Sequence, residues 1–163
     1  MKVWRKARRF LAYTPRQKRM LAEAWLLLAW ARFLKLLPFA SAIRLLGASR
    51  EETPHAPDPA EAAAIRQTGA ALLIMSRHTW WTSNCLVLAM AGMAMLSRRG
   101  IESTMYLGTA RDPRTGGMIA HAWLRSGPWV VTGAKEIERY TVVAVFGRSR
   151  ACGGVQRSVS HGS

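Results

Sequence analysis

Apolar positions in the first third of the chain follow a helical pattern. Between residues 15 and 38 bulky apolar residues recur among good helix formers on nearly every side, after a Pro that suits a first helical turn. This predicts a helix buried against the rest of the protein or against a partner. A shorter helix is expected over residues 39–46, ending at Gly47, and a loop over residues 48–57.

Two further helices are predicted in the middle of the chain. Residues 58–61 read Asp-Pro-Ala-Glu, which combines a capping Asp, a Pro for the first helical position and an acid near the positive end of the dipole. That helix should run to about residue 75. Residues 85–99 are almost continuously apolar until Gly100, which predicts a second helix that opens with Cys85.

The second half of the chain changes to a β pattern. Short runs of β-branched and aromatic residues, separated by Gly and Pro, predict strands at residues 105–107, 121–124, 129–132 and 141–146. Ser126-Gly127-Pro128 is expected to form a hairpin turn. Helices followed by antiparallel strands predict an α+β fold.

Composition predicts one compact unit with appendages. A chain of 163 residues, half of them hydrophobic, can bury one ordinary core. We divide it into a basic N-terminal helical region (residues 1–57), a core (58–147) and a tail (148–163) that is rich in Gly, Ser and Arg and expected to be disordered.

Positive charge is concentrated near the N-terminus. The chain has 24 Lys and Arg against 9 Asp and Glu, and residues 1–22 contain no acid. Such a segment attracts acidic peptides, phosphate backbones or anionic lipids, although a solvated helical face explains it equally well. No apolar stretch is long enough to span a bilayer without interruption by charges, so we expect a cytoplasmic protein with at most a peripheral membrane contact through its basic N-terminus.

The two cysteines differ in their surroundings. Neither Cys85 nor Cys152 belongs to a zinc-type cluster or a disulfide framework, and no metal or cofactor is expected. Ser83 and Asn84 are capping residues that would place the Cys85 sulfur at a helix N-terminus, where the dipole favours a thiolate and unpaired N–H groups could hold an oxyanion. A buried, inert cysteine is the alternative interpretation.

His121 is the histidine best placed to serve as a base. It opens a predicted strand, whereas His55 and His161 fall in predicted loop or tail, and His78 precedes Cys85 by only seven residues. A structural histidine on an alternating strand is the alternative.

Several motifs together resemble the lasso-peptide leader peptidases of the transglutaminase-like, papain-like cysteine protease superfamily. The resemblance covers about half of the chain. It is carried by Trp80-Trp-Thr-Ser-Asn-Cys-Leu86, Leu96-Ser-Arg-Arg-Gly-Ile101, Tyr106-Leu-Gly108, Ala120-His-Ala-Trp-Leu124, Trp129-Val-Val-Thr-Gly133 and Tyr140-Thr-Val-Val-Ala-Val-Phe146.

The resemblance implies a central Cys-bearing helix packed on a small antiparallel sheet, with Cys85 as nucleophile and His121 as general base and acid. It also implies cleavage of a lasso precursor peptide between leader and core. A separate leader-recognition protein and an ATP-dependent macrolactam cyclase would be the partners, and no nucleic acid is expected. Trp80, Trp81 and Asn84 are expected to line the cleft, with core packing the competing role for the tryptophans.

One part of the superfamily pattern is missing. Its members usually carry an Asp on the strand after the His, but both aspartates of this chain precede His121. If Ser126-Gly127 is a two-residue turn, Thr132 lies across from His121. We therefore predict that Thr132 or a nearby backbone carbonyl orients the imidazole, with Glu136 less favoured and an ordinary strand Thr as the alternative.

Two other functions fit parts of the sequence. A non-catalytic basic helical module that binds acidic peptide or a membrane surface explains the N-terminal charge but not the Cys and His pattern. A transglutaminase-type acyl transferase would share the thioester intermediate, so the sequence alone does not separate it from a peptidase.

Overall fold

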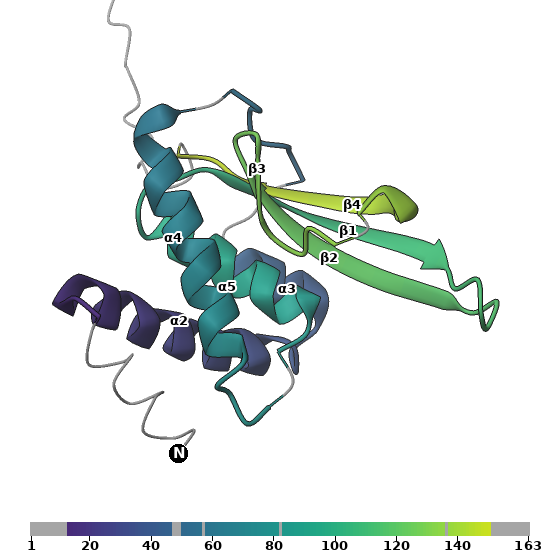
Figure 1. Ribbon diagram of the computed structural model, residues 1–163. Coiled ribbons are helices and arrows are strands. Elements are labelled where there is room, and N and C mark those ends of the chain that lie inside the picture. Colours follow the sequence, from purple (N-terminus) through teal and green to yellow (C-terminus); the bar gives the residue numbers. More distant parts are fainter. Residues whose placement is uncertain (1–12, 47–49, 57, 82, 136, 151–163) are drawn as a thin grey trace, which may run out of the picture.

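The computed structural model describes residues 13–46, 50–56, 58–81, 83–135 and 137–150 (Figure 1). Helices come first and strands follow, so the predicted α+β class is confirmed. The helices are α2 (Pro15–Leu34), α3 (Phe39–Leu45), α4 (Pro59–Ser76) and α5 (Cys85–Ser97). The strands are β1 (Ser103–Arg111), β2 (Met118–Ser126), β3 (Trp129–Thr132) and β4 (Thr141–Arg148), with a short 3₁₀ helix at Ile137–Arg139 before β4.

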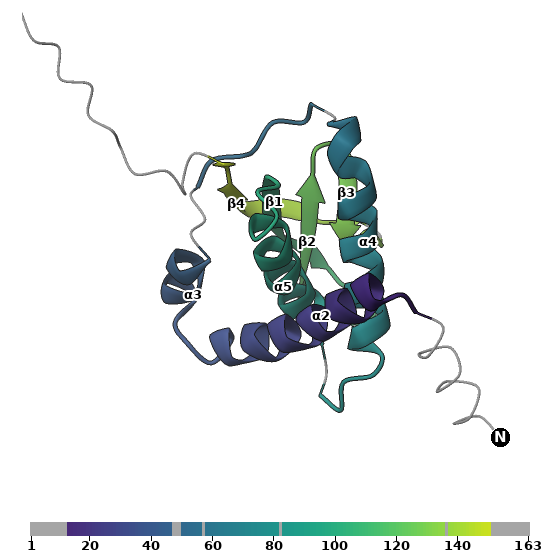
Figure 2. The ribbon, with the colours of Figure 1, turned by 90° about the vertical axis from the view of Figure 1, so that its left-hand side faces the viewer.

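The four strands form one antiparallel sheet in the order β3-β2-β1-β4. Helix α5 lies at the centre of the molecule, where it packs against β1, β2 and β3 as well as against α2 and α4. Figure 2 shows α2 crossing α4 and α5 on the side away from the sheet. A central helix on a small antiparallel sheet is the predicted arrangement.

The helix boundaries follow local signals. Asp58 caps α4 by accepting a hydrogen bond from the Ala60 N–H at 3.0 Å, and Pro59 takes the first helical position, as predicted. Thr14 and Gln17 form a capping box at the start of α2. Beyond α5, Gly100 has a φ of +67°, a conformation that glycine adopts without strain.

The core is built around α5. Eight of its thirteen residues are buried, among them Met90, Met93 and Leu96, which are at most 1% exposed. Each such side chain contributes on the order of 2 kcal/mol of burial free energy. Helix α2 adds Ala24 and Leu28 to this core, so the N-terminal helix packs with the rest of the chain rather than apart from it.

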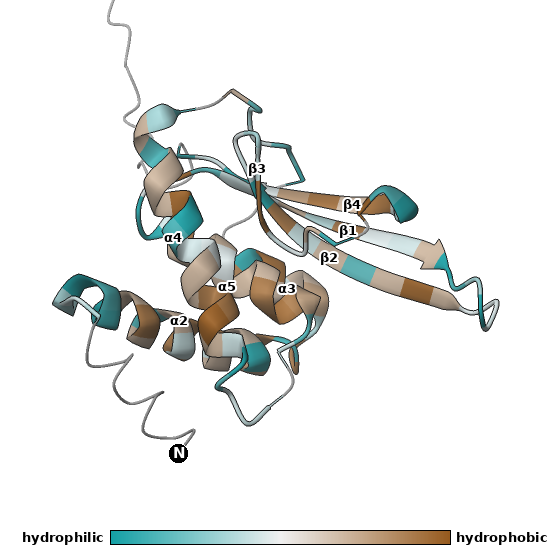
Figure 3. Cartoon of the chain, in the orientation of Figure 1, coloured by the Kyte–Doolittle hydropathy of each residue, from teal (hydrophilic) through white to brown (hydrophobic). Residues whose placement is uncertain are grey.

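The outer side of α2 is also apolar. Leu26, Trp30 and Phe33 follow one another at i, i+4 and i+7 and are 61%, 36% and 68% exposed. In Figure 3 the hydrophilic colour gathers instead at the start of α2 and at the tip of the β1–β2 hairpin. Within the described part of the chain, no helix combines the length and the apolar character that crossing a bilayer requires.

The β2–β3 hairpin corrects the predicted register. Ser126 pairs with Trp129, so the two-residue turn is Gly127-Pro128 and not Ser126-Gly127, and Gly127 has a φ of +53°. A bulge follows between Leu124 and Arg125. As a result Thr132 pairs with Leu124, and the prediction that it faces His121 is wrong.

Some predictions concern residues at the edge of, or outside, the described part of the chain. Arg148, assigned to the tail, is the last residue of β4. Most of the predicted tail, with Cys152 and His161, lies outside the described residues, and so do Gly47 and Glu136.

Candidate functional site

Cys85 is the first residue of α5, as predicted. Asn84 caps this helix, since its Oδ1 accepts a hydrogen bond from the Val87 N–H at 3.1 Å. The Leu88 N–H makes a backbone bond to the Asn84 carbonyl at 3.1 Å. The half-buried Cys85 side chain thus lies at the positive end of the helix dipole, where an anion is favoured.

The loop between α4 and α5 is held by hydrogen bonds and by tryptophans. Thr79 Oγ1 lies 3.0 Å from the carbonyl of Ser76 and 3.2 Å from Ser83 Oγ. The Trp81 ring lies 5.9 Å from that of Trp25 in α2. Its indole N–H is buried and has no hydrogen-bond partner among the described residues.

Trp80 and Trp81 differ in exposure. Trp80 is 93% exposed and meets Trp81 edge to face at 5.7 Å, so Trp80 does not belong to the core. Trp81 is half-buried. Their role, with Asn84, as walls of a cleft stays a prediction.

His121 is held by a backbone carbonyl and two aromatic rings. Its Nε2 lies 2.8 Å from the carbonyl oxygen of Gly133. Because a carbonyl only accepts, Nε2 must donate in this bond, which leaves Nδ1 as the basic nitrogen of the neutral ring. The ring also lies 6.0 Å from that of Trp123 and 4.9 Å from that of Tyr140. Of the two predicted orienting groups, the nearby backbone carbonyl is therefore the one that contacts the imidazole.

Thr132 makes no such contact. It shares the α5 side of the sheet with its partner Leu124, and a Cβ on Gly92 of α5 would lie 3.9 Å from the Thr132 methyl. Its hydroxyl is buried and unpartnered among the described residues. We correct the predicted geometry accordingly.

Neither aspartate accompanies His121. Asp58 caps α4, while Asp112 lies at the tip of the β1–β2 hairpin. The backbone N–H of Arg114 and the hydroxyl of Thr115 lower the pKa of Asp112. Both carboxylates are thus engaged in local turns, and a carbonyl occupies the position next to the imidazole.

Cys85 and His121 belong to elements that pack on each other, α5 and β2. Ala122 and Leu124 point into the core shared with α5, so strand alternation places His121 and Trp123 on the other side of β2. The structure records no hydrogen bond between the Cys85 sulfur and the imidazole, although it describes both residues. The two residues therefore lie on adjoining elements, but the His121 side chain is on the side of β2 away from α5 and no bond joins it to Cys85.

A buried arginine on the same side of β2 was not foreseen from the sequence. Arg125 donates to the carbonyls of Thr53 at 2.7 Å and Gly127 at 2.6 Å, and pairs with Glu52 at 3.1 Å. The Tyr106 hydroxyl bonds to Glu52 and receives a hydrogen bond from Arg125. The hydrogen bond from Tyr106 lowers the pKa of Glu52, and burial raises the pKa of Tyr106.

This network fixes the aromatic rings on which His121 is stacked. Tyr106 stacks on Trp123 with ring centroids 5.3 Å apart, and Trp123 stacks on His121. The one signal in the sequence is a period of two that places His121, Trp123 and Arg125 on one side of a strand.

No metal centre is formed by the part of the chain that the structure describes. There, no three His, Cys, Asp or Glu side chains come together in a group that could hold an ion.

Comparison with known protein families gives a match over most of the chain. The profile of a family described as "Transglutaminase-like superfamily" matches residues 24–145, which take in all of α3, α4, α5 and β1 to β3, the second half of α2 and the first part of β4. Neither the curated proteins nor the solved structures contain a significant match.

Proposed function

Because the chain belongs to the transglutaminase-like superfamily, we propose that it is a cysteine peptidase that removes the leader from a lasso-peptide precursor. The observation that carries the proposal is the position of Cys85 as the first residue of an Asn-capped, buried helix. The motifs around Cys85 and His121 resemble those of leader peptidases, and this resemblance supports the choice of substrate.

The reaction needs one thiol and one imidazole. His121 Nδ1 takes the proton from Cys85 Sγ, which attacks the carbonyl carbon of the scissile peptide bond. Free N–H groups at the start of α5 stabilise the negative oxygen that forms. The carbon–nitrogen bond then breaks, the imidazolium protonates the leaving amine, and a thioester remains on Cys85.

Hydrolysis completes the cycle. His121 takes a proton from water, the resulting hydroxide attacks the thioester, and the sulfur leaves with the proton that the imidazolium returns. The products are a leader ending in a carboxylate and a core peptide with a free amine. That amine is the group that a macrolactam cyclase requires.

The Gly133 carbonyl fixes the role of each ring nitrogen. With Nε2 donating to Gly133, the imidazole keeps the tautomer in which Nδ1 is the base. Nδ1 must then approach Sγ, and such bonds are commonly long in substrate-free enzymes and shorten when substrate binds. Because His121 lies on the side of β2 away from α5, this step also requires the imidazole or strand β2 to move towards α5 when substrate binds, together with rotation of the Cys85 side chain and movement of the exposed Trp80.

The proposed partners follow from the same resemblance. A separate leader-recognition protein presents the precursor, and an ATP-dependent cyclase consumes the released core, all in the cytoplasm. The basic N-terminal region is available for a peripheral contact with either a partner or a membrane.

The test is cleavage of a precursor supplied with its recognition protein, followed by mass spectrometry. We expect leader release by the wild-type chain and by Cys152→Ala, and none by Cys85→Ala or His121→Ala with unchanged circular dichroism. Undiminished cleavage by Cys85→Ala overturns the proposal. A product joined to an added amine, in place of a free carboxylate, assigns the acyl-transferase reaction instead.

Reactivity of the thiol gives a second test that needs no substrate. Iodoacetamide at pH 6 should label Cys85 faster than Cys152, because thiolate at a helix N-terminus reacts and ordinary thiol does not. Equal, slow labelling of both cysteines contradicts an activated nucleophile.

A further inference from the structure

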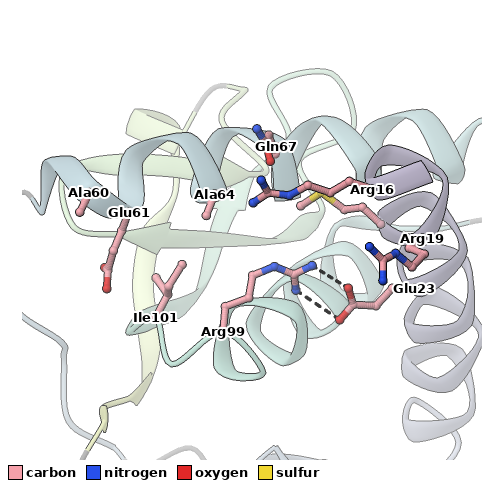
Figure 4. A pocket seen from close by; sticks show the side chains of 10 residues that line it. Arg16, Arg19, Glu23, Ala60, Glu61, Ala64, Gln67, Arg99 and Ile101 are labelled. Atoms are coloured by element: carbon pink, nitrogen blue, oxygen red, sulfur yellow. Dashed lines mark hydrogen bonds and ion pairs between the residues drawn. The ribbon is translucent and has the colours of Figure 1, made fainter. Parts of the chain in front are cut away.

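A basic pocket lies at the end of α5 opposite to Cys85. Its volume is about 440 Å³, and it lies between the first half of α2, the first half of α4 and the residues that follow α5. Figure 4 shows the guanidinium groups of Arg16, Arg19 and Arg99 pointing into the space between these elements.

The two carboxylates that line the pocket already have partners. Arg99 binds both oxygens of Glu23, at 2.6 and 3.2 Å, and Arg98 adds a third bond at 3.0 Å. Glu61 pairs with Arg150. Neither carboxylate is therefore free to neutralise further positive charge.

Arg16 and Arg19 have no ion pair with any residue that the structure describes, and both are exposed. They occupy the first two turns of α2, where the positive end of the helix dipole disfavours cations, and the first turn contains no acid. Of the chain's nine acidic residues, Glu23 and Glu61 are the two that line the pocket. The pocket thus holds two guanidinium groups, near a helix N-terminus, that form no ion pair with the described residues.

A second, apolar pocket of about 240 Å³ adjoins the first. The two share Arg16, Met20 and Gln67, and the second extends along α2 and α4. Its further lining includes Leu21, Ala71 and Ile74. Together they form one groove between α2 and α4, basic at one end and apolar at the other.

We propose that this groove binds an acidic peptide segment. A Glu or Asp side chain pairs with Arg16 and Arg19, and a neighbouring apolar side chain enters the second pocket. Gln67 supplies an amide for the peptide backbone. The adjoining apolar pocket favours a peptide over a phosphate backbone, because a peptide can present an acidic and an apolar side chain next to each other.

The basic end of the groove lies far from the nucleophile. Arg99 and Cys85 are fourteen residues apart at the two ends of α5, which corresponds to about 20 Å along the helix axis. An extended peptide covers about 3.3 Å per residue, so at least about six residues separate the anchor from the scissile bond. This inference rests on the proposed function, because it assigns the groove as the site that anchors the precursor peptide.

Binding can be measured without catalysis. The probe is a fluorescein-labelled peptide with two Glu residues beside a Leu, added to the Cys85→Ala chain and followed by fluorescence anisotropy at 0.15 M salt. We expect Arg16→Ala/Arg19→Ala to weaken binding about tenfold. The matched control is Arg44→Ala/Arg66→Ala, which removes the same charge from exposed positions outside both pockets and should change binding less than twofold.

Two matched peptides separate the parts of the groove. With the Glu residues of the peptide replaced by Gln, the two double variants should bind it with equal affinity. With Leu replaced by Ser, the peptide should bind more weakly to every variant. Equal losses in the two double variants, or equal competition by a single-stranded oligonucleotide, indicate unspecific attraction by net charge and overturn the inference. Because the probe is not cleaved, a chain that binds it in this way but releases no leader contradicts the proposed function alone.

Discussion

Nε2 of His121 lies 2.8 Å from the carbonyl oxygen of Gly133, twelve residues further along the chain. This bond supplies the hydrogen-bond acceptor that a carboxylate provides elsewhere in the superfamily pattern. A carbonyl carries no full charge, so it orients the neutral ring but stabilises an imidazolium less than a carboxylate does. The position of the Gly133 carbonyl therefore controls which nitrogen of His121 acts as base.

Gly133→Ala should damage both the fold and the reaction. Gly133 has a φ of +75°, and a Cβ there would lie 2.5 Å from the Ala122 carbonyl oxygen and 2.9 Å from Trp123 Cβ. We expect a loss of about 3 kcal/mol in unfolding free energy, measured in urea, and at least a tenfold drop in kcat.

Gly116→Ala is the matched control. Gly116 has a φ of +71°, but no atom lies within 4 Å of the added Cβ. Gly116→Ala should lower the unfolding free energy by about 1 kcal/mol and leave kcat unchanged. Similar losses for both variants would show that backbone strain, and not the contact with β2, dominates at Gly133.

Two changes at Asn84 separate helix capping from thiol reactivity. Asn84→Ala removes the acceptor for the Val87 N–H and should cost about 1 kcal/mol. Asn84→Asp keeps the cap and the stability, but its negative charge beside Cys85 should slow iodoacetamide labelling severalfold. Labelling by Asn84→Asp at the wild-type rate would contradict the placement of the sulfur at the helix N-terminus.

Arg125→Met should destabilise the sheet more than any change at Glu52. The Arg125 side chain is 8% exposed, and its loss leaves the buried carbonyl of Thr53 and the partly buried carbonyl of Gly127 without this donor, at a cost of about 3 kcal/mol in unfolding free energy. Glu52 is 43% exposed, so Glu52→Gln should cost under about 1 kcal/mol. Urea denaturation measures the unfolding free energy of both variants. Equal losses would show that the ion pair between Arg125 and Glu52 is the dominant contact.

Glu23 should make stability depend on pH in the acid range. Burial raises the pKa of Glu23, but the hydrogen bonds and charges of Arg99 and Arg98 outweigh it and hold that pKa below the ordinary 4.5. A carboxyl with a lowered folded pKa stabilises the fold above its unfolded pKa, and that contribution disappears as the pH falls through the folded pKa.

Glu23→Gln should therefore be less stable than wild type by about 1 kcal/mol at pH 7, with the difference shrinking as the pH falls below 4.5. Thermal melts over this range measure it. Glu51→Gln, at an exposed position, serves as the control and should match wild type throughout. A difference in stability that stays constant as the pH falls would assign the effect to packing.

The features that the sequence predicted well are set by neighbouring residues. The Asp58 and Pro59 start of α4, the Asn84 cap before Cys85 and the left-handed Gly100 each depend on a few adjacent positions. Alternating strands depend on them as well. For this reason the α+β order and the position of Cys85 could be predicted.

The features that could not be predicted join distant segments. The register of β3 depends on a turn at Gly127-Pro128 and on a bulge, and a shift of either moves Thr132 to another partner. Arg125 binds Thr53, 72 residues earlier, through a loop without regular structure. No local sequence pattern predicts such contacts. Every residue has a backbone carbonyl, so the residue type does not reveal which carbonyl accepts the hydrogen bond.

The exposed apolar side of α2 and the basic groove at its start respond oppositely to salt. Any salt screens the attraction between guanidinium groups and carboxylates, whereas kosmotropic salts such as sulfate strengthen the burial of Leu26, Trp30 and Phe33 against an apolar surface. Salt concentration therefore selects which surface binds during purification. Dilute buffer favours binding of the groove to acidic ligands, and concentrated sulfate favours association along α2.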